Sequence, residues 1–211
     1  MIIKKLIALG SVVFLTACAT TEPVTPFKPY NLSINEQYTQ ASSGMTFPLT
    51  VGDFKRGDLR VYVEDISDIS APYYYRDSAT PILVTVYSTQ ATKFISIGSP
   101  QSVKDEMRQN LFDNYFTGHK NQILRIYGED KQTEAGNYTL IQPGQTLEGR
   151  YAKFAYHTKF AGNMRDVESY LYLFQVDKTY YKYRVTHPVM DAETALITDF
   201  LTALALPLPV E

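Results

Sequence analysis

The feature that most constrains the fold is an alternation of apolar and polar residues with a period of two. It is clearest from Leu59 to Glu64, where Leu59, Val61 and Val63 share one face. Such alternation with β-branched residues is typical of a strand that buries one face. Five further segments have a strand-like composition: 71–76, 81–88, 151–158, 169–176 and 180–186. The three residues between the last two are few enough for a hairpin.

Two helices are expected between and after these strand groups. Ser99-Pro100 suits a helix start and Gly118 a helix stop. Apolar residues that recur at every fourth position predict the buried face of this helix: Val103, Met107, Leu111 and Tyr115. A second helix is expected from Asp191 to about Leu204. The order of elements therefore predicts one α+β domain over residues 46–211, with an antiparallel sheet of about six strands covered by two main helices.

The start of the chain has a different pattern. Lys4 and Lys5 precede an apolar stretch, 6–15, and the sequence Leu-Thr-Ala-Cys follows at 15–18. A basic start, a short apolar region and small residues before a cleavage point are typical of an export signal. The apolar stretch is shorter than the roughly 20 residues of an ordinary membrane span.

The tetrapeptide resembles the lipobox of bacterial lipoproteins. The resemblance implies cleavage between Ala17 and Cys18, diacylglyceryl attachment to the Cys18 sulfur and acylation of the new amino terminus with a chain such as palmitate. Ala19, in place of Asp, implies sorting to the cell outer membrane rather than retention in the inner one. The alternatives are an ordinary signal peptide cut after Ala19 and an uncleaved anchor.

Residues 18–45 are expected to hold the lipidated cysteine and a flexible tether, after a signal peptide at 1–17. Pro23, Pro26 and Pro29 lie there among many polar residues, with no hydrophobic period. Packing of Tyr30 to Ile34 on the domain is the alternative.

Composition limits the chemistry that the domain can carry. Cys18 is the only cysteine, so a lipidated protein has no disulfide and no thiol nucleophile. The formal net charge of −2 includes the two signal lysines, so the chain without its signal is more acidic still. This acidic balance argues against nucleic acid as a partner. The expected partners are the membrane, through the acyl chains, and another envelope component.

Known catalytic and metal-binding motifs are missing from the sequence. His119, His157 and His187 have no paired-ligand spacing. The chain contains no GxSxG, SxxK or nucleotide-binding glycine motif. Arg56-Gly57-Asp58 is interpreted as a turn. We therefore expect no catalytic residue, no metal and no cofactor, although a dispersed triad escapes motif searches.

Tyrosine is abundant, with 17 residues, and tryptophan is absent. Rings beside Lys182 and Arg184 could bind ligands by stacking and cation–π contacts. The candidate binding residues are Tyr73, Tyr75, Tyr170, Tyr172, Tyr181 and Tyr183. The alternative is that these rings pair across strands and pack in the core.

From Tyr151 to Leu204, where a long hairpin leads into a C-terminal helix, the chain resembles PsbP-like domains. The segment Tyr170-Leu171-Tyr172-Leu173-Phe174 to Lys182-Tyr183-Arg184 also resembles a segment that recurs in bacterial envelope proteins. These resemblances imply mostly accessory and binding roles. The leading hypothesis is a membrane-anchored envelope lipoprotein with a non-catalytic binding domain. The alternatives are a small-ligand or glycan binder that uses the tyrosines, and a hydrolase with a dispersed site.

Overall fold

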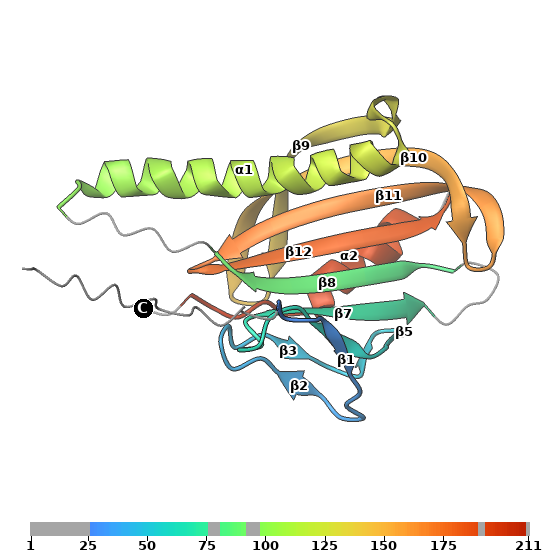
Figure 1. Ribbon diagram of the computed structural model, residues 1–211, viewed down its shortest axis with the longest axis horizontal. Coiled ribbons are helices and arrows are strands. Elements are labelled where there is room, and N and C mark those ends of the chain that lie inside the picture. The colour runs from blue at the N-terminus through green and yellow to red at the C-terminus, as the bar shows by residue number, and fades with distance from the viewer. Residues whose placement is uncertain (1–25, 76–80, 92–97, 190–192, 210–211) are drawn as a thin grey trace, which may run out of the picture.

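The computed structural model describes residues 26–75, 81–91, 98–189 and 193–209. Within them, twelve strands are formed in two sheets (Figure 1). The strands are β1 (Tyr30–Leu32), β2 (Tyr38–Thr39), β3 (Thr46–Phe47), β4 (Thr50–Val51), β5 (Phe54–Arg56), β6 (Leu59–Val61), β7 (Asp68–Tyr75), β8 (Leu83–Gln90), β9 (Gln132–Gln142), β10 (Gln145–Phe160), β11 (Asn163–Val176) and β12 (Thr179–Pro188).

The main sheet has ten strands, and every strand pair in it is antiparallel. Its order is β1-β6-β7-β8-β12-β11-β10-β9, with β5 pairing β7 and β4 pairing β5. β2 and β3 form a separate two-stranded sheet. The long meander from β9 to β12 is joined by tight turns, and Ala161, Gly162 and Asp177 adopt positive φ there.

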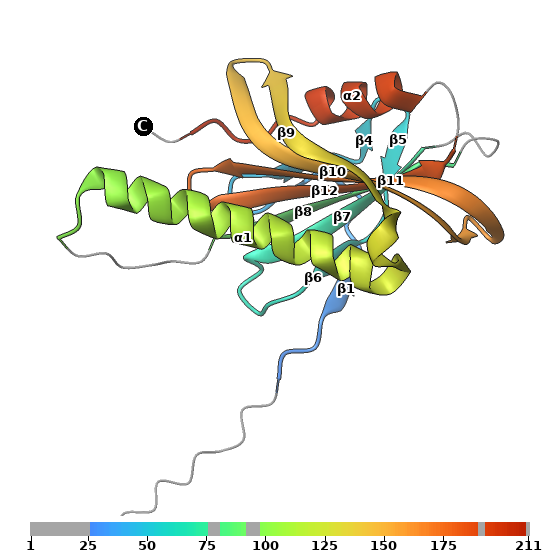
Figure 2. The ribbon, with the colours of Figure 1, turned by 90° about the horizontal axis from the view of Figure 1, so that it is seen from above.

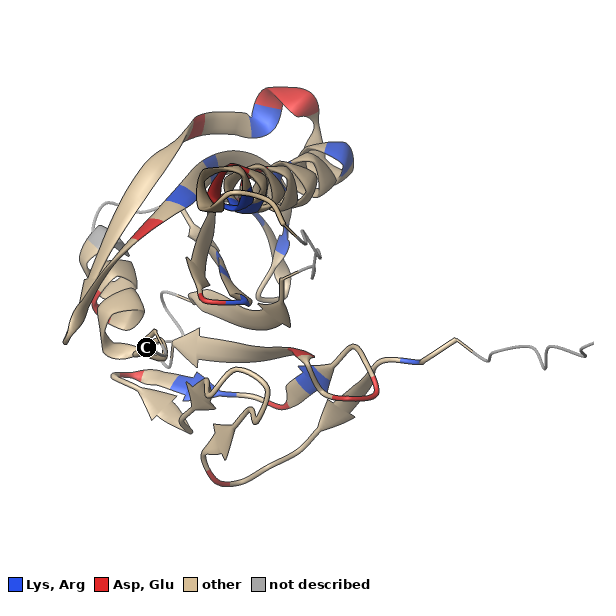
Figure 3. Cartoon of the chain, turned by 90° about the vertical axis from the view of Figure 1, so that its left-hand side faces the viewer, with Lys and Arg blue, Asp and Glu red and all other residues tan. Residues whose placement is uncertain are grey.

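Two helices lie on opposite faces of the main sheet (Figure 2). α1 (Gln101–Tyr127) is followed by a single 3₁₀ turn, η1 (Glu129–Lys131), and α2 (Glu193–Ala203) closes the fold. Figure 3, a view along α1, shows the sheet curving beneath this helix. Neither helix has the length and apolar character that crossing a bilayer requires, within the ranges described.

The sheet separates two hydrophobic cores. The larger core fills the α2 side, where Phe200 contacts the rings of Phe54 and Tyr73 at centroid distances of 4.8 and 5.2 Å. The smaller core lies under α1, where Phe112, Phe116 and Ile123 meet β10, β11 and β12. Because the smaller core stops at β12, α1 covers only part of its side of the sheet.

The predicted fold is confirmed in outline. Antiparallel sheet dominates, two helices are present, and all six expected strands form, including the 177–178 hairpin turn. The number of strands was wrong, because the sheet has ten. Of the four strands that were not predicted, β1, β4 and β5 are too short to show an alternating pattern. β9 is mostly exposed along its length, so its sequence carries few apolar residues.

The prediction for α1 was wrong in its end and its face. The helix continues through Gly118 to Tyr127. Its buried residues are Phe112, Phe116 and Ile123, whereas Val103 and Met107 of the predicted face are 40% and 39% exposed. The reason is visible in Figure 1, where the first turns of α1, which carry Val103 and Met107, extend past the end of the sheet.

The folded part begins at Tyr30 rather than near residue 46. β1 pairs with β6, and Met45 is fully buried. Arg56 holds this segment, because its guanidinium donates hydrogen bonds to the carbonyls of Phe47, Ile34 and Glu36. Arg56 is only 5% exposed, so its side chain is not available for adhesion. The expected tether therefore ends before residue 30, and the packing alternative describes residues 30–34.

Candidate functional site

Strand β12 directs two chemically different sets of side chains to the two faces of the sheet. Tyr181, Tyr183 and Val185 enter the core on the α2 side. Because side chains alternate along a strand, Lys182 and Arg184 face α1 instead. The strand thus carries aromatic and aliphatic residues on one face and two cations on the other.

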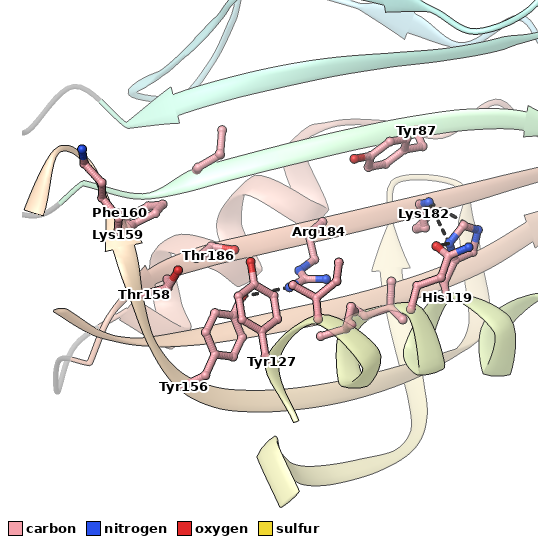
Figure 4. Close-up of a pocket in the computed structure, with 15 residues that line it drawn as sticks. Tyr87, His119, Tyr127, Tyr156, Thr158, Lys159, Phe160, Lys182, Arg184 and Thr186 are labelled. Carbon is pink, nitrogen blue, oxygen red and sulfur yellow. Dashed lines mark hydrogen bonds between the residues drawn. The ribbon is translucent and has the colours of Figure 1, made fainter. Parts of the chain in front are cut away.

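Lys182 and Arg184 border a cleft of about 380 Å³ between the C-terminal half of α1 and the sheet (Figure 4). This volume lies within the usual range of small-molecule sites, roughly 300–1,000 Å³. The cleft is lined by Leu83, Tyr87, His119, Gln122, Ile123, Ile126, Tyr127, Tyr156, Thr158, Lys159, Phe160, Leu171, Lys182, Arg184 and Thr186.

Lys182 is held by aromatic and neutral partners. Its Nζ lies 4.0 Å from the centroid of the Tyr87 ring and 3.3 and 3.4 Å from the two ring nitrogens of His119. Burial lowers the pKa of Lys182 to about 8; the carboxylate of Asp68 opposes this shift and the charge of Arg184 adds to it. The ammonium is therefore mostly protonated at neutral pH but poorly solvated.

His119 is a neutral neighbour of this ammonium. Burial, and then the charge of Lys182, lower the pKa of His119 to about 4. A neutral imidazole can accept a hydrogen bond from Lys182, and its Nδ1 also lies 3.2 Å from Oε1 of Gln122. The partners of His119 in these interactions are an ammonium and an amide, whereas His157 has a carboxylate partner, Asp166, 2.9 Å away on the exposed part of the β10–β11 hairpin.

Arg184 is oriented by two hydroxyl groups. Its Nε donates to Oγ of Ser169 at 2.7 Å, and one terminal nitrogen donates to the Tyr156 hydroxyl at 2.9 Å. Within the described residues, neither Arg184 nor Lys182 forms an ion pair with a carboxylate. Two fixed cations in a partly apolar cleft attract an anion strongly, because the local dielectric constant is low.

Aromatic rings form the wall next to Arg184. Tyr127 from α1 stacks on Tyr156 from β10, with ring centroids 3.8 Å apart and planes 12° apart. Burial, followed by the neighbouring Tyr156, raises the pKa of Tyr127, so its hydroxyl is protonated at neutral pH. Ile126 stands at the rim and is 72% exposed. The cleft thus combines a charged part with an apolar part.

The tyrosines singled out from the sequence lie on the opposite side of the sheet from this cleft. Tyr73, Tyr172, Tyr181 and Tyr183 are at most 6% exposed and belong to the larger core. The other two, Tyr75 and Tyr170, are partly buried and pack against the same core. The prediction that these six rings form an accessible binding face was wrong, because strands β7, β11 and β12 direct them toward α2.

Sequence reasoning noted Lys182 and Arg184 only as neighbours of the tyrosines. Their own signal was the spacing of two cations at alternate positions in a strand whose other face is apolar. The contribution of His119, Tyr127 and Tyr156 to one cleft had no such signal, because it depends on where α1 crosses β10 and β12.

The remaining predicted sites have different outcomes. Ala17, Cys18 and Ala19 lie outside the described residues. Over the ranges that the structure describes, no group of three or more potential metal ligands is found. In Figure 3, basic and acidic residues are interspersed along the chain. Comparison with protein-family models, curated proteins and solved structures found no match to this chain.

Proposed function

We propose that the protein is a lipid-anchored binding protein of the bacterial envelope, and that its binding site is the cleft between α1 and the sheet. Its single domain acts without catalysis and accepts an anionic envelope component in this cleft. The observation that carries the proposal is the orientation of Lys182 and Arg184 into the cleft, with no ion pair to a carboxylate in the described part of the chain.

The energetic argument concerns the cost of a buried cation. A lysine in apolar surroundings loses hydration, which is the cause of the lowered pKa of Lys182. Replacing such a residue by an apolar one is often neutral or stabilising. A bound carboxylate, phosphate or sulfonate would supply the missing negative charge and offset this cost. A buried charge that lowers the stability of the fold is common where a site serves binding rather than stability.

The membrane anchor follows from the N-terminal sequence. Acylation at Cys18 would attach the domain to the outer membrane, and the tether up to residue 29 would allow it to reorient there. The resemblance to PsbP-like domains supports an accessory role rather than a catalytic one. The domain would then hold its anionic ligand at the membrane surface.

The test of anion binding uses two dyes that share their rings and differ in charge. Anilinonaphthalene sulfonate is anionic, whereas phenylnaphthylamine lacks the sulfonate. Full-length protein in nanodiscs of zwitterionic lipid should give saturable sulfonate-dye fluorescence above empty nanodiscs. Lys182→Met should weaken this binding about tenfold, the effect of losing one charged hydrogen bond. The neutral dye should bind both proteins equally.

The matched control is Lys178→Met, which removes a lysine that is exposed in the turn between β11 and β12. This variant should bind the sulfonate dye as the unmodified protein does. Equal loss in both variants, or no saturable binding at all, would exclude the cleft as an anion site.

A further inference from the structure

The cleft has a charged end and an apolar end. Figure 4 shows Lys182 and His119 together at one end, Arg184 between, and Phe160 at the other end. Toward Phe160 the lining includes Leu83 and the Tyr127–Tyr156 pair, together with Thr158 and Thr186. Lys159 stands at this outer rim, where it is exposed. A ligand that fills the cleft therefore needs an anionic head and an apolar body.

The apolar end is better suited to a hydrocarbon chain than to a sugar or a stacked base. Tyr127 and Tyr156 already stack on each other, so each ring keeps at most one face for a ligand. Of the neutral polar side chains on the lining, His119, Gln122 and Tyr156 already have hydrogen-bond partners within the protein. The others are Tyr87, Tyr127, Thr158 and Thr186. A sugar needs many such partners, because its hydroxyl groups lose water on binding. A methylene chain needs only apolar contact.

We propose that the cleft binds a free long-chain fatty acid. Its carboxylate lies between Lys182 and Arg184, where it receives charge-assisted hydrogen bonds. Its chain follows the Tyr127–Tyr156 wall and leaves the cleft between Ile126 and Phe160. The exposure of Ile126, 72%, gives the emerging part of the chain an apolar rim. This inference rests on the proposed function and specifies the ligand of the same site.

The location of the cleft suits a ligand that comes from a membrane. The first described residues leave the sheet at β1 on the same side as α1 (Figure 2). The tether from Cys18 to Tyr30 can span at most ~43 Å. With Cys18 acylated, the domain would stay within this distance of the lipid surface, where fatty acids partition.

Photocrosslinking in nanodiscs tests this inference on the full-length protein. The probes are palmitic acid with a diazirine in its chain and the corresponding palmityl alcohol, which has the same chain and no charge. The acid should label residues 119–127 and 154–160, as mapped by mass spectrometry of peptides. The alcohol, and the acid with Lys182→Met, should label these segments about tenfold less. Lys178→Met should leave the labelling unchanged.

The possible outcomes separate the ligand class from the proposed function. Equal labelling by acid and alcohol, or labelling spread over other segments, would overturn the fatty-acid assignment. If the sulfonate dye still binds through Lys182 while the acid leaves the cleft unlabelled, the cleft is an anion site for a ligand without an acyl chain. Loss of both signals would overturn the two proposals together.

Discussion

At the scale of single residues, Lys182 is placed where its charge is costly to the fold. The side chain is surrounded by the Tyr87 ring, the neutral His119 and the aliphatic lining of the cleft. The carboxylate of Asp68 attracts this charge, Arg184 on the same strand repels it more weakly, and the loss of hydration outweighs both. Stability alone would favour an apolar residue at this position.

Lys182→Met is therefore expected to raise the free energy of unfolding at pH 7 by about 1–3 kcal/mol. The folded protein has a pKa of about 8 at Lys182 against 10.5 in the unfolded chain, so the penalty is fully present below pH 8. It disappears only when the unfolded chain also loses this proton, above pH 10.5, and it grows no further below pH 8. 

The direction of this pH dependence follows from the number of protons that each state binds at Lys182. Between pH 8 and pH 10.5 the unfolded chain binds more protons at Lys182 than the folded protein does, so stability of the parent rises with pH over this window relative to the variant. At pH 7 both states are mostly protonated and the cost of the buried charge is at its largest. In urea unfolding, the difference in the free energy of unfolding between variant and parent should therefore be smaller at pH 9.5 than at pH 7. A constant difference would contradict the buried charge as its cause.

Substitution of Gly149 and of Gly118 by alanine should change stability in opposite directions. A Cβ on Gly149 in β10 would lie 2.4 Å from the carbonyl oxygen of Leu173 and 2.6 Å from Cδ1 of Phe174. Gly149→Ala should cost about 2–3 kcal/mol of stability, because backbone must move. Gly118 in α1 has no atom within 4 Å of a Cβ, so Gly118→Ala should gain about 0.5–1 kcal/mol from helix propensity. Thermal unfolding of both variants measures the contrast, and a similar loss in both would refute it.

At the scale of elements, the sequence predicted what is visible within a single segment. The strand-like composition of 180–186 identified β12, and the short connection after Val176 identified its hairpin. The segment places Tyr181, Tyr183 and Val185 on one apolar face, but it does not tell which helix covers that face. α2 decides this face by packing on one side of the sheet.

The part of the cleft that His119 forms was missed for the same reason, because it depends on packing between distant segments. His119 lies beyond the glycine that was interpreted as the end of the helix, so it was not expected on α1 at all. Its contact with Lys182 joins residues 63 positions apart in the chain. No local pattern reports such a contact, because it depends on how α1 crosses the sheet.

β9 fastens the C-terminal segment through one buried side chain. Gln142, 4% exposed, donates hydrogen bonds to the carbonyls of Leu201 and Leu204 at 2.7 and 2.9 Å. Its Oε1 accepts one from the amide of Leu206 at 2.9 Å. The side chain thus satisfies the end of α2 and directs Leu206 into the larger core.

Gln142→Ala should cost about 2–3 kcal/mol, because three buried backbone groups lose their partner. Hydrogen exchange should accelerate at the Leu206 amide more than in β11 or β12. Gln109→Ala is the matched control, since Gln109 is exposed and its side chain donates a hydrogen bond to Asp113 across one helical turn. If the two glutamine variants unfold at the same urea concentration, the bonds of Gln142 do not hold the segment.

At the scale of the whole molecule, the two faces of the sheet are covered unequally. α2, the C-terminal segment and the short N-terminal strands close the side of the larger core. α1 closes the other side over β10 and β11 and leaves the cleft beside β12 and β8. The closed side accounts for stability, and the partly open side accounts for the proposed binding.

The proposed anchor belongs to this scale, because it would decide where the partly open side operates. One acyl chain holds a protein weakly, whereas two or three hold it firmly, at about 0.8 kcal/mol per buried methylene.

In a Gram-negative host fed an alkyne analogue of palmitate, the unmodified protein should carry the label in the outer membrane. Cys18→Ala should lose the label and keep its signal peptide, whereas Ala19→Asp should keep the label and move to the inner membrane. The Ala19 variant controls for expression and folding, because it alters sorting without removing the sulfur. A Cys18→Ala protein that is still processed and bound to the outer membrane would show that something other than acyl chains attaches the domain there, and the route of a fatty acid to the cleft would then need another explanation.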